Sequence, residues 1–196
     1  MTNNESVPNI NNQHNMLEIV AVTLFFVILL GLGVFVYQDY GLTWDDLAQV
    51  EIGELNYKYV FEGDETLLTF KNRYYGPVFE MLLYRITRDM ADPQRFFMRH
   101  FLIFSLFVIG LFFFYLLGKR ITKNWAAGLL GCVLIIASPR IFAHSFFNSK
   151  DIPFMAVFII AIFTLIRYLD RRTALNAVMH ALTTAVLIGL RAPGVL

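Results

Sequence analysis

The first long apolar run, residues 17–37, constrains the fold of this chain most. At about 1.5 Å per residue, a helix of that length crosses a hydrocarbon core of roughly 30 Å. Only 16% of the residues are charged, against about 25% in soluble domains. Four further runs reach or approach spanning length: 97–118, 125–143, 152–169 and 174–191. The sequence therefore predicts an all-α polytopic membrane protein with about five transmembrane helices, folded as a single transmembrane domain over residues 17–196.

The charges outside these runs predict an orientation. Residues 1–16 are polar and lack Lys and Arg, so they do not resemble a signal peptide and are expected to form a disordered tail. Basic residues gather in two short turns, 118–124 and 167–173, and the positive-inside rule assigns such turns to the cytoplasm. The N-terminus would then be cytoplasmic and the long loop 38–96 would lie outside. A net charge of +1 gives no indication of nucleic-acid binding.

The outer loop has the pattern of amphipathic helices that lie in the membrane interface. Near its start, apolar residues recur on one helical face; Asp45 borders that face, whereas Asp46 points away from it. After the Gly-Pro pair at 76–77 a second amphipathic helix is predicted, with Glu80 away from the apolar face. That face comprises Phe79, Leu82, Leu83, Ile86 and Met90.

Three carboxylates, those of Asp39, Asp45 and Asp46, follow the first run where the chain leaves the membrane. At headgroup depth they can act on a substrate whose lipid tail is held in the bilayer. Equally, Thr43 is a suitable N-cap and Asp46 stands three residues later, as in a capping box, where the helix dipole favours an acid. The sequence leaves helix capping and catalysis as even alternatives.

A second polar stretch lies between the third and fourth apolar runs, on the same predicted face. Ser138-Pro139-Arg140 interrupts the third run, whose outer end is expected to unwind. Cations and amides gathered at a membrane face predict a site for a lipid phosphate. The alternative is a solvated turn, in which Asp151 caps the next helix and Pro153 opens it. The polar set comprises Arg140, His144, Asn148, Lys150, Asp151 and, at the outer end of the fifth run, Arg191.

The sequence carries no metal-binding motif. Its four histidines are scattered, without the spacing of paired ligands. Cys132 lies inside an apolar run, where an inert packing role is expected. No cofactor and no dedicated metal site are predicted, and participation of a divalent cation is left open.

Together these stretches resemble the GT-C membrane glycosyltransferases, most closely the protein mannosyltransferase and aminoarabinose transferase type. The resemblance rests on the acidic pair after the first span, the loop with its Tyr-Gly-Pro break, and the Lys-Asp-x-Pro turn before the fourth span. The segment SPRIFAHSFFNSKDIPFM and the cationic end of the fifth run are its more specific part. It covers about residues 17–194 and corresponds to the N-terminal part of a GT-C fold. Such enzymes usually have eleven or more spans, so a fragment or a truncated relative is expected.

The resemblance implies a donor sugar carried on a polyprenyl or dolichyl phosphate. The sugar would pass with inversion to a hydroxyl of a protein, lipid or glycan, at the outer face of a bacterial inner membrane or of the endoplasmic reticulum membrane. In that family the first acid of the pair is catalytic, which carries over to Asp45 with Asp46 as its neighbour. Tyr75 falls where many members have a basic residue.

The expected chemistry needs one carboxylate. A lipid phosphate is an acidic leaving group, so it needs charge stabilisation more than protonation, and Asp45 would serve as general base. The phosphate would bind to Arg140, Lys150 and Arg191, and further candidates are Asp151, His144 and Tyr75. A non-enzymatic polytopic protein, such as a transporter piece or an assembly factor, is the alternative, and an inactive aborted gene product is a third. Transporters place charges near the midplane, whereas polar residues here gather at one face, which favours an interfacial reaction site.

Overall fold

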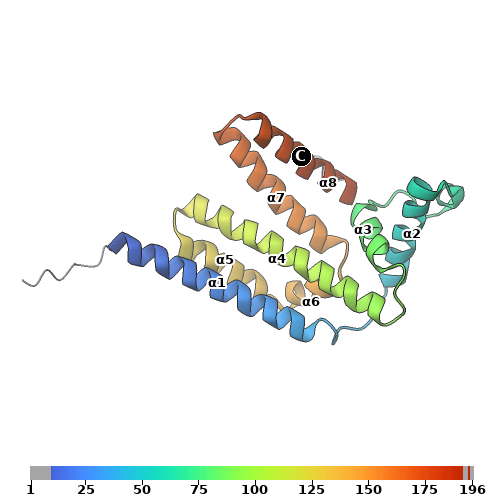
Figure 1. Cartoon of the computed structure of the whole chain (residues 1–196), viewed down its shortest axis with the longest axis horizontal. Coiled ribbons are helices and arrows are strands. Elements are labelled where there is room, and N and C mark those ends of the chain that lie inside the picture. Colours follow the sequence, from blue (N-terminus) through green and yellow to red (C-terminus); the bar gives the residue numbers. More distant parts are fainter. Residues whose placement is uncertain (1–9, 192–193, 195–196) are drawn as a thin grey trace, which may run out of the picture.

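The computed structural model describes residues 10–191 and Gly194, and within them every regular element is a helix. This confirms the predicted all-α class (Figure 1). Helix α1 begins inside the segment predicted to be a disordered tail, and residues 1–9 lie outside the described part. The elements are α1 (Ile10–Val36), α2 (Asp46–Glu62), the 3-10 helix η1 (Glu65–Thr69), α3 (Val78–Thr87), α4 (Gln94–Thr122), α5 (Trp125–Ile136), α6 (Pro139–Phe147), α7 (Asp151–Asp170) and α8 (Ala174–Leu190).

The number of spans differs from the prediction. Within the described residues, three helices are long and apolar enough to cross a membrane: α1 over Asn15–Val36, α4 and α7. The pair α5 and α6 is a fourth candidate if it is taken as one broken span. Helix α8 is apolar but has only 17 residues. The predicted five spans are therefore corrected to three, or to four with the broken pair.

The break between α5 and α6 is a sharp bend of 76° between two helices. Pro139 cannot continue α5 because it has no N–H to donate. It instead takes the first position of α6, and Ser138 caps that helix by accepting a hydrogen bond from the Ile141 N–H at 3.5 Å. The outer end of the third run therefore forms a separate helix, and the predicted unwinding is wrong.

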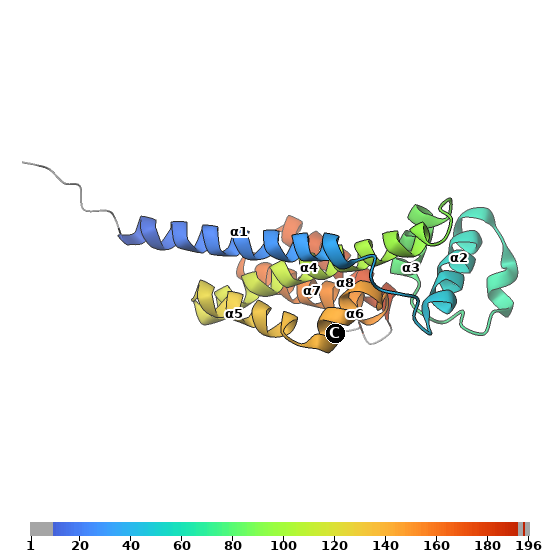
Figure 2. The same cartoon turned by 90° about the horizontal axis from the view of Figure 1, so that it is seen from below.

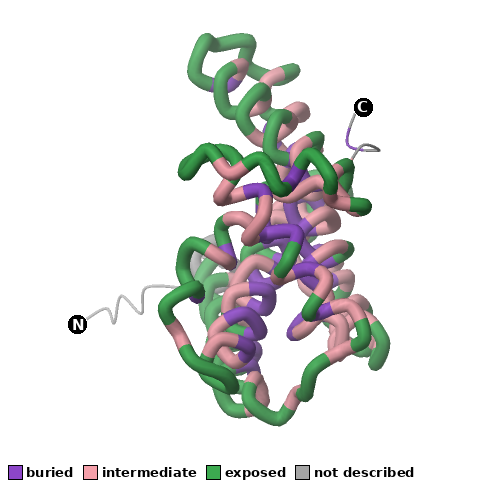
Figure 3. Tube along the Cα trace, turned by 90° about the vertical axis from the view of Figure 1, so that its right-hand side faces the viewer, coloured by how far each residue is buried: buried purple, intermediate pink, exposed green. Residues whose placement is uncertain are grey.

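Helix α4 lies at the centre of the bundle, where it contacts α1, α5, α6 and α7 (Figures 1 and 2). Its residues Phe104 and Phe107 are almost inaccessible, and Figure 3 shows the buried residues concentrated along the middle of the bundle. Helices α4 and α5 approach each other closely at Gly118 and Gly128. A Cβ atom added to either would lie 2.8–2.9 Å from the other helix's backbone, so both positions require glycine.

The loop 38–96 folds into a helical cap of α2, η1 and α3 at one end of the bundle (Figures 1 and 2). Helix α3 confirms the second amphipathic helix. Of its predicted apolar face, Phe79 and Leu83 are buried, whereas Leu82 and Ile86 are 53% and 40% exposed. Glu80 is also buried, with 2% of its surface exposed, although its polar character predicted an outward position.

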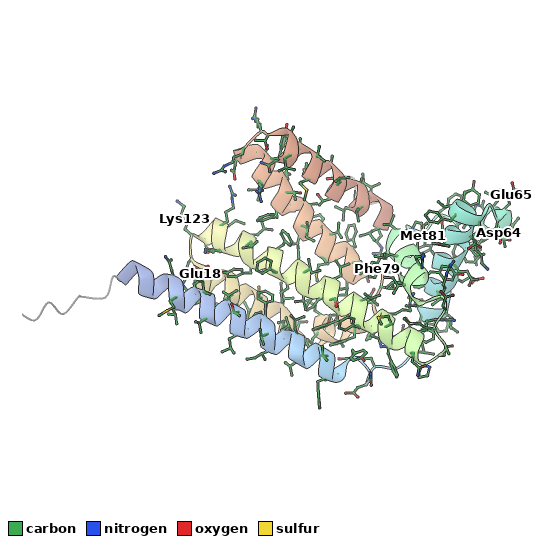
Figure 4. All side chains as sticks on the ribbon, in the orientation of Figure 1. Glu18, Asp64, Glu65, Phe79, Met81 and Lys123 are labelled. Atoms are coloured by element: carbon green, nitrogen blue, oxygen red, sulfur yellow. The ribbon has the colours of Figure 1, made fainter. Side chains whose placement is uncertain are left out.

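The two basic turns lie together at the end opposite the cap. Arg120 forms an ion pair with Asp170, which joins the turn after α4 to the turn after α7. Figure 4 labels Lys123 at this end and Asp64 at the capped end. The turns thus share one side of the bundle, as the charge pattern requires, and their cytoplasmic orientation stays a prediction.

Candidate functional site

A cleft of about 290 Å³ opens at the capped end, where the start of α2 meets the turn between α6 and α7. The two stretches of sequence that form most of it are about a hundred residues apart, and the end of α8 completes it. Its charged or titratable lining residues are Asp45, Asp46, His144, Lys150, Asp151 and Arg191. The cleft therefore brings together the acidic pair and most of the predicted phosphate site.

Two ion pairs cross this cleft. The Lys150 Nζ atom lies 2.5 Å from Asp45 Oδ2, and the Arg191 Nη1 atom lies 2.7 Å from Asp151 Oδ1. About half of the Asp45 side chain, 48%, stays exposed. Each cation is thus held by a carboxylate that a ligand entering from solvent can reach.

The two acids at the start of α2 have different environments. Asp46 accepts a hydrogen bond from the Thr43 N–H at 2.5 Å, which is one half of a capping box. Asp45 makes no such capping bond and faces Lys150 instead. Asp46 is 4% exposed, so the prediction that it points away from the interior is wrong. The capping interpretation thus describes Asp46, whereas the catalytic interpretation of Asp45 stays a prediction.

The predicted apolar face of α2 is not the face that the helix buries, because α2 packs mainly its polar side against the rest of the protein. The buried residues are Asp46, Gln49, Ile52, Gly53 and Asn56, whereas Trp44 and Leu47 are 97% and 68% exposed. Helix α2 packs on α3 so closely that a Cβ atom on Gly53 would lie 2.5 Å from the Glu80 carbonyl oxygen. The exposed apolar face is suited to the membrane interface.

Asn148 shapes the turn that carries Lys150. Its Oδ1 atom accepts hydrogen bonds from the backbone N–H groups of Lys150 at 3.1 Å and Asp151 at 2.8 Å. Its Nδ2 atom lies 2.8 Å from His144 Nδ1 and 3.0 Å from Asp151 Oδ2. The alternative interpretation, in which Asp151 caps this helix, is not what the structure has: Asp151 is the first residue of α7, and its N–H donates to Asn148. An Asn that precedes a helix start is the sequence signal for this turn.

A stack of aromatic rings holds the chain before α2 against the bundle. The Tyr40 ring stacks on Phe146 of α6, and Phe146 stacks on Phe104 of α4, each at 4.5 Å between centroids. Phe146 is fully buried. Because Tyr40 comes five residues before Asp45, this stack fixes where the chain approaches the cleft.

A buried ion pair lies in the interface between the cap and the bundle. Arg99 Nη2 donates to Glu80 Oε2 at 2.7 Å, and both side chains are only 3% exposed. Burial raises the pKa of the Glu80 carboxyl, and the Arg99 guanidinium acts in the opposite direction. Ser149, which lines the cleft, also lowers the pKa of this carboxyl, whereas the charge of Asp46 raises it. Sequence reasoning missed the pair, although a charge such as Arg99 inside a predicted span calls for a partner.

Two of the predicted site residues do not line the cleft. Arg140 is exposed on α6, and Tyr75 is half-exposed outside the lining. Gly76, next to Tyr75, packs against Leu190, the residue before Arg191. The prediction that Arg140 joins Lys150 and Arg191 at one site is therefore corrected, whereas the Tyr-Gly-Pro break borders the end of α8.

Among the described residues, no group of three or more His, Cys, Asp or Glu side chains is arranged to hold a metal ion. No model of a known protein family, no curated protein and no solved structure matches the chain.

Proposed function

We propose that the protein is an inverting glycosyltransferase that uses a sugar carried on a polyprenyl or dolichyl phosphate. The observation that carries this proposal is the contact between Asp45 and Lys150 in a cleft that also contains Arg191. One carboxylate and two cations of this kind are what the transfer of a sugar from a phosphate to a hydroxyl requires. The cleft lies at the end of the bundle opposite the basic turns, which is the predicted outer face.

Binding of the donor would rearrange the two ion pairs. Lys150 and Arg191 are each paired with one carboxylate, and a phosphate oxygen can replace that carboxylate as the hydrogen-bond acceptor. Exchange at Lys150 would free Asp45 at the moment when the phosphate is bound. The donor would thus both occupy the site and release its base.

The transfer then needs one proton acceptor. The acceptor hydroxyl oxygen attacks the anomeric carbon, the bond from that carbon to the phosphate oxygen breaks, and the lipid phosphate leaves with the electron pair. Asp45 takes the hydroxyl proton, a role typically worth 10²–10⁴-fold in rate. Lys150 and Arg191 stabilise the negative charge that develops on the phosphate.

An apolar groove beside the cleft suits the lipid part of the donor. It has a volume of about 520 Å³, and apart from Ser105 it is lined by apolar residues of α3, α4, α7 and α8. Leu190 forms one end of its lining, directly before Arg191. A lipid chain in this groove would bring its phosphate to the cations of the cleft, while membrane lipids surround the rest of the bundle.

A transfer assay tests the proposal. The protein is reconstituted in vesicles with a polyprenyl-phosphate sugar and candidate protein, lipid or glycan acceptors, and the release of polyprenyl phosphate is measured. Asp45→Asn is expected to lower the rate by about 10²–10⁴-fold. Asp39→Asn, an exposed acid outside the cleft, is the control and should keep the rate. Equal rates for both variants would reject Asp45 as the base, and sugar flux without transfer would favour the non-enzymatic alternative.

A further inference from the structure

A second polar cavity lies at the opposite end of the bundle, far from the cleft. It has a volume of about 320 Å³ and is formed where the last turns of α4 and α7 meet. Its lining residues are Arg120, Phe163, Arg167, Asp170 and Arg171. This set, the arginine pocket, contains three guanidinium groups and a single carboxylate, and therefore has an excess of positive charge.

The carboxylate of the arginine pocket is already engaged. Asp170 forms an ion pair with Arg120, which joins the ends of α4 and α7. Among the contacts of the described residues, the side chains of Arg167 and Arg171 have neither an ion pair nor a hydrogen bond to a protein acceptor. Two guanidinium groups four residues apart repel each other, and an anion bound between them would relieve that repulsion. The pocket thus has the donors for an anion but no protein group that supplies one.

The position of the pocket indicates where the anion comes from. Helices α4 and α7 are both candidate membrane spans, so their ends lie at the depth of lipid headgroups. Phe163, two turns before the end of α7, contributes an apolar ring to the pocket and packs edge-on against Phe113. A polar opening beside an aromatic ring suits a phosphate joined to a glycerol backbone and acyl chains, and basic pockets between helices on the cytoplasmic side bind such lipids.

We propose that the arginine pocket binds the phosphate headgroup of an anionic membrane phospholipid, with Arg167 and Arg171 as the phosphate ligands and Arg120 held in place by Asp170. The guanidinium fork matches phosphate oxygens in a bidentate manner. The alternative explanation for these arginines is that cations at a helix C-terminus complement the helix dipole. That effect requires no pocket, and it would be similar for every basic residue of the turn. This site is independent of the proposed sugar transfer.

Arg172 provides a matched control, because it has the same charge in the same exposed turn but does not line the pocket. The full chain in a nonionic detergent is titrated with dioleoyl phosphatidylglycerol, dioleoyl phosphatidylcholine or inorganic phosphate. Binding is followed by native mass spectrometry and by the shift of the melting temperature. Phosphatidylglycerol is expected to bind and raise the melting temperature, whereas phosphatidylcholine and inorganic phosphate should have little effect.

Substitution in the pocket should weaken phosphatidylglycerol binding by roughly tenfold or more for each arginine removed, as expected for a lost charge-assisted hydrogen bond. This applies to Arg167→Gln and to Arg171→Gln, while Arg172→Gln should bind as the wild type does. If Arg167→Gln fails to fold, Arg171→Gln gives the same test, because Arg171 lies beyond the last residue of α7. Equal weakening in Arg172→Gln would indicate diffuse charge attraction and overturn the proposal. Equal binding of phosphatidylcholine, or binding of inorganic phosphate with the same loss in the arginine variants, would also overturn it.

Discussion

Replacement of Glu80 by Leu removes one partner of the buried ion pair between the cap and the bundle. Leu is close to Glu in size, so the main loss is the acceptor for Arg99, whose guanidinium cannot lose its proton. Both side chains are 3% exposed and the atoms are 2.7 Å apart. A buried charge left without its partner costs about 3–5 kcal/mol, so Glu80→Leu should lower the free energy of unfolding by that amount.

Glu80→Gln separates the hydrogen bond from the charge. Gln still offers an oxygen to Arg99 but leaves the guanidinium charge uncompensated, so Glu80→Gln should lower the free energy of unfolding by less than Glu80→Leu does. Because burial raises the pKa of Glu80, the folded state holds the proton of this carboxyl more tightly than the unfolded state does. The stability that protonation of Glu80 adds to the fold is complete below the pKa of the unfolded state, about 4.3. It is lost as the pH rises through the higher pKa of the folded state. Relative to Glu80→Gln, the wild type should therefore become less stable as the pH rises.

The assay is unfolding in mixed micelles, followed by circular dichroism as the SDS fraction increases. The control is Glu54→Gln, which breaks an ion pair of similar length, 2.6 Å to Lys58, between side chains that are about one-third exposed. Such a pair is worth only about 0.3–0.5 kcal/mol. Two results would show that this ion pair does not stabilise the fold as described: Glu80→Leu unfolding like Glu54→Gln, or a wild type that gains stability over Glu80→Gln with rising pH.

Three further predictions follow from packing around the cleft. Phe146→Ala removes the middle ring of the aromatic stack and should destabilise the protein by about 3–5 kcal/mol in the same unfolding assay, and a loss below 1 kcal/mol would contradict this. Gly76→Ala puts a Cβ atom 2.2 Å from the Leu190 carbonyl oxygen, whereas Gly41→Ala meets nothing within 4 Å; only the first should lower the melting temperature. Asn148→Ala removes the bonds that hold the start of α7 and should cost about 1–2 kcal/mol, and an unchanged unfolding curve would reject its role.

The sequence predicted the parts of the fold that depend on hydropathy and on local turn chemistry. Hydropathy identified the long apolar helices, and the Gly-Pro pair at 76–77 marked the start of α3. The bend between α5 and α6 was signalled by Pro139, but its consequence was misjudged because a Ser at position 138 can start a new helix at once. The span count failed at α8 and at this bend for the same reason: apolar composition does not fix helix length or direction.

The candidate site was predicted in part. The proximity of Asp45 to the turn at 140–151 follows from both lying at one membrane face, and the structure has the two in contact. The assignments of Asp46 and Arg140 depended on which way a helix is turned about its axis, which tertiary contacts decide. Glu80 could not be found from its own helix, because its burial depends on a cation that α4 supplies.

In the proposed mechanism Asp45 and a donor phosphate compete for Lys150, and this competition can be measured by binding and turnover together. The dissociation constant for a polyprenyl phosphate and the rate of sugar transfer are measured for wild type, Asp45→Asn and Lys150→Gln. Loss of a charge-assisted bond should weaken binding to Lys150→Gln by about tenfold or more. Asp45→Asn should bind the lipid phosphate at least as tightly as the wild type while it loses transfer. If Asp45→Asn binds the lipid phosphate more weakly than the wild type, Asp45 does not compete with the phosphate for Lys150. If Asp45→Asn still transfers sugar, Asp45 is not the base.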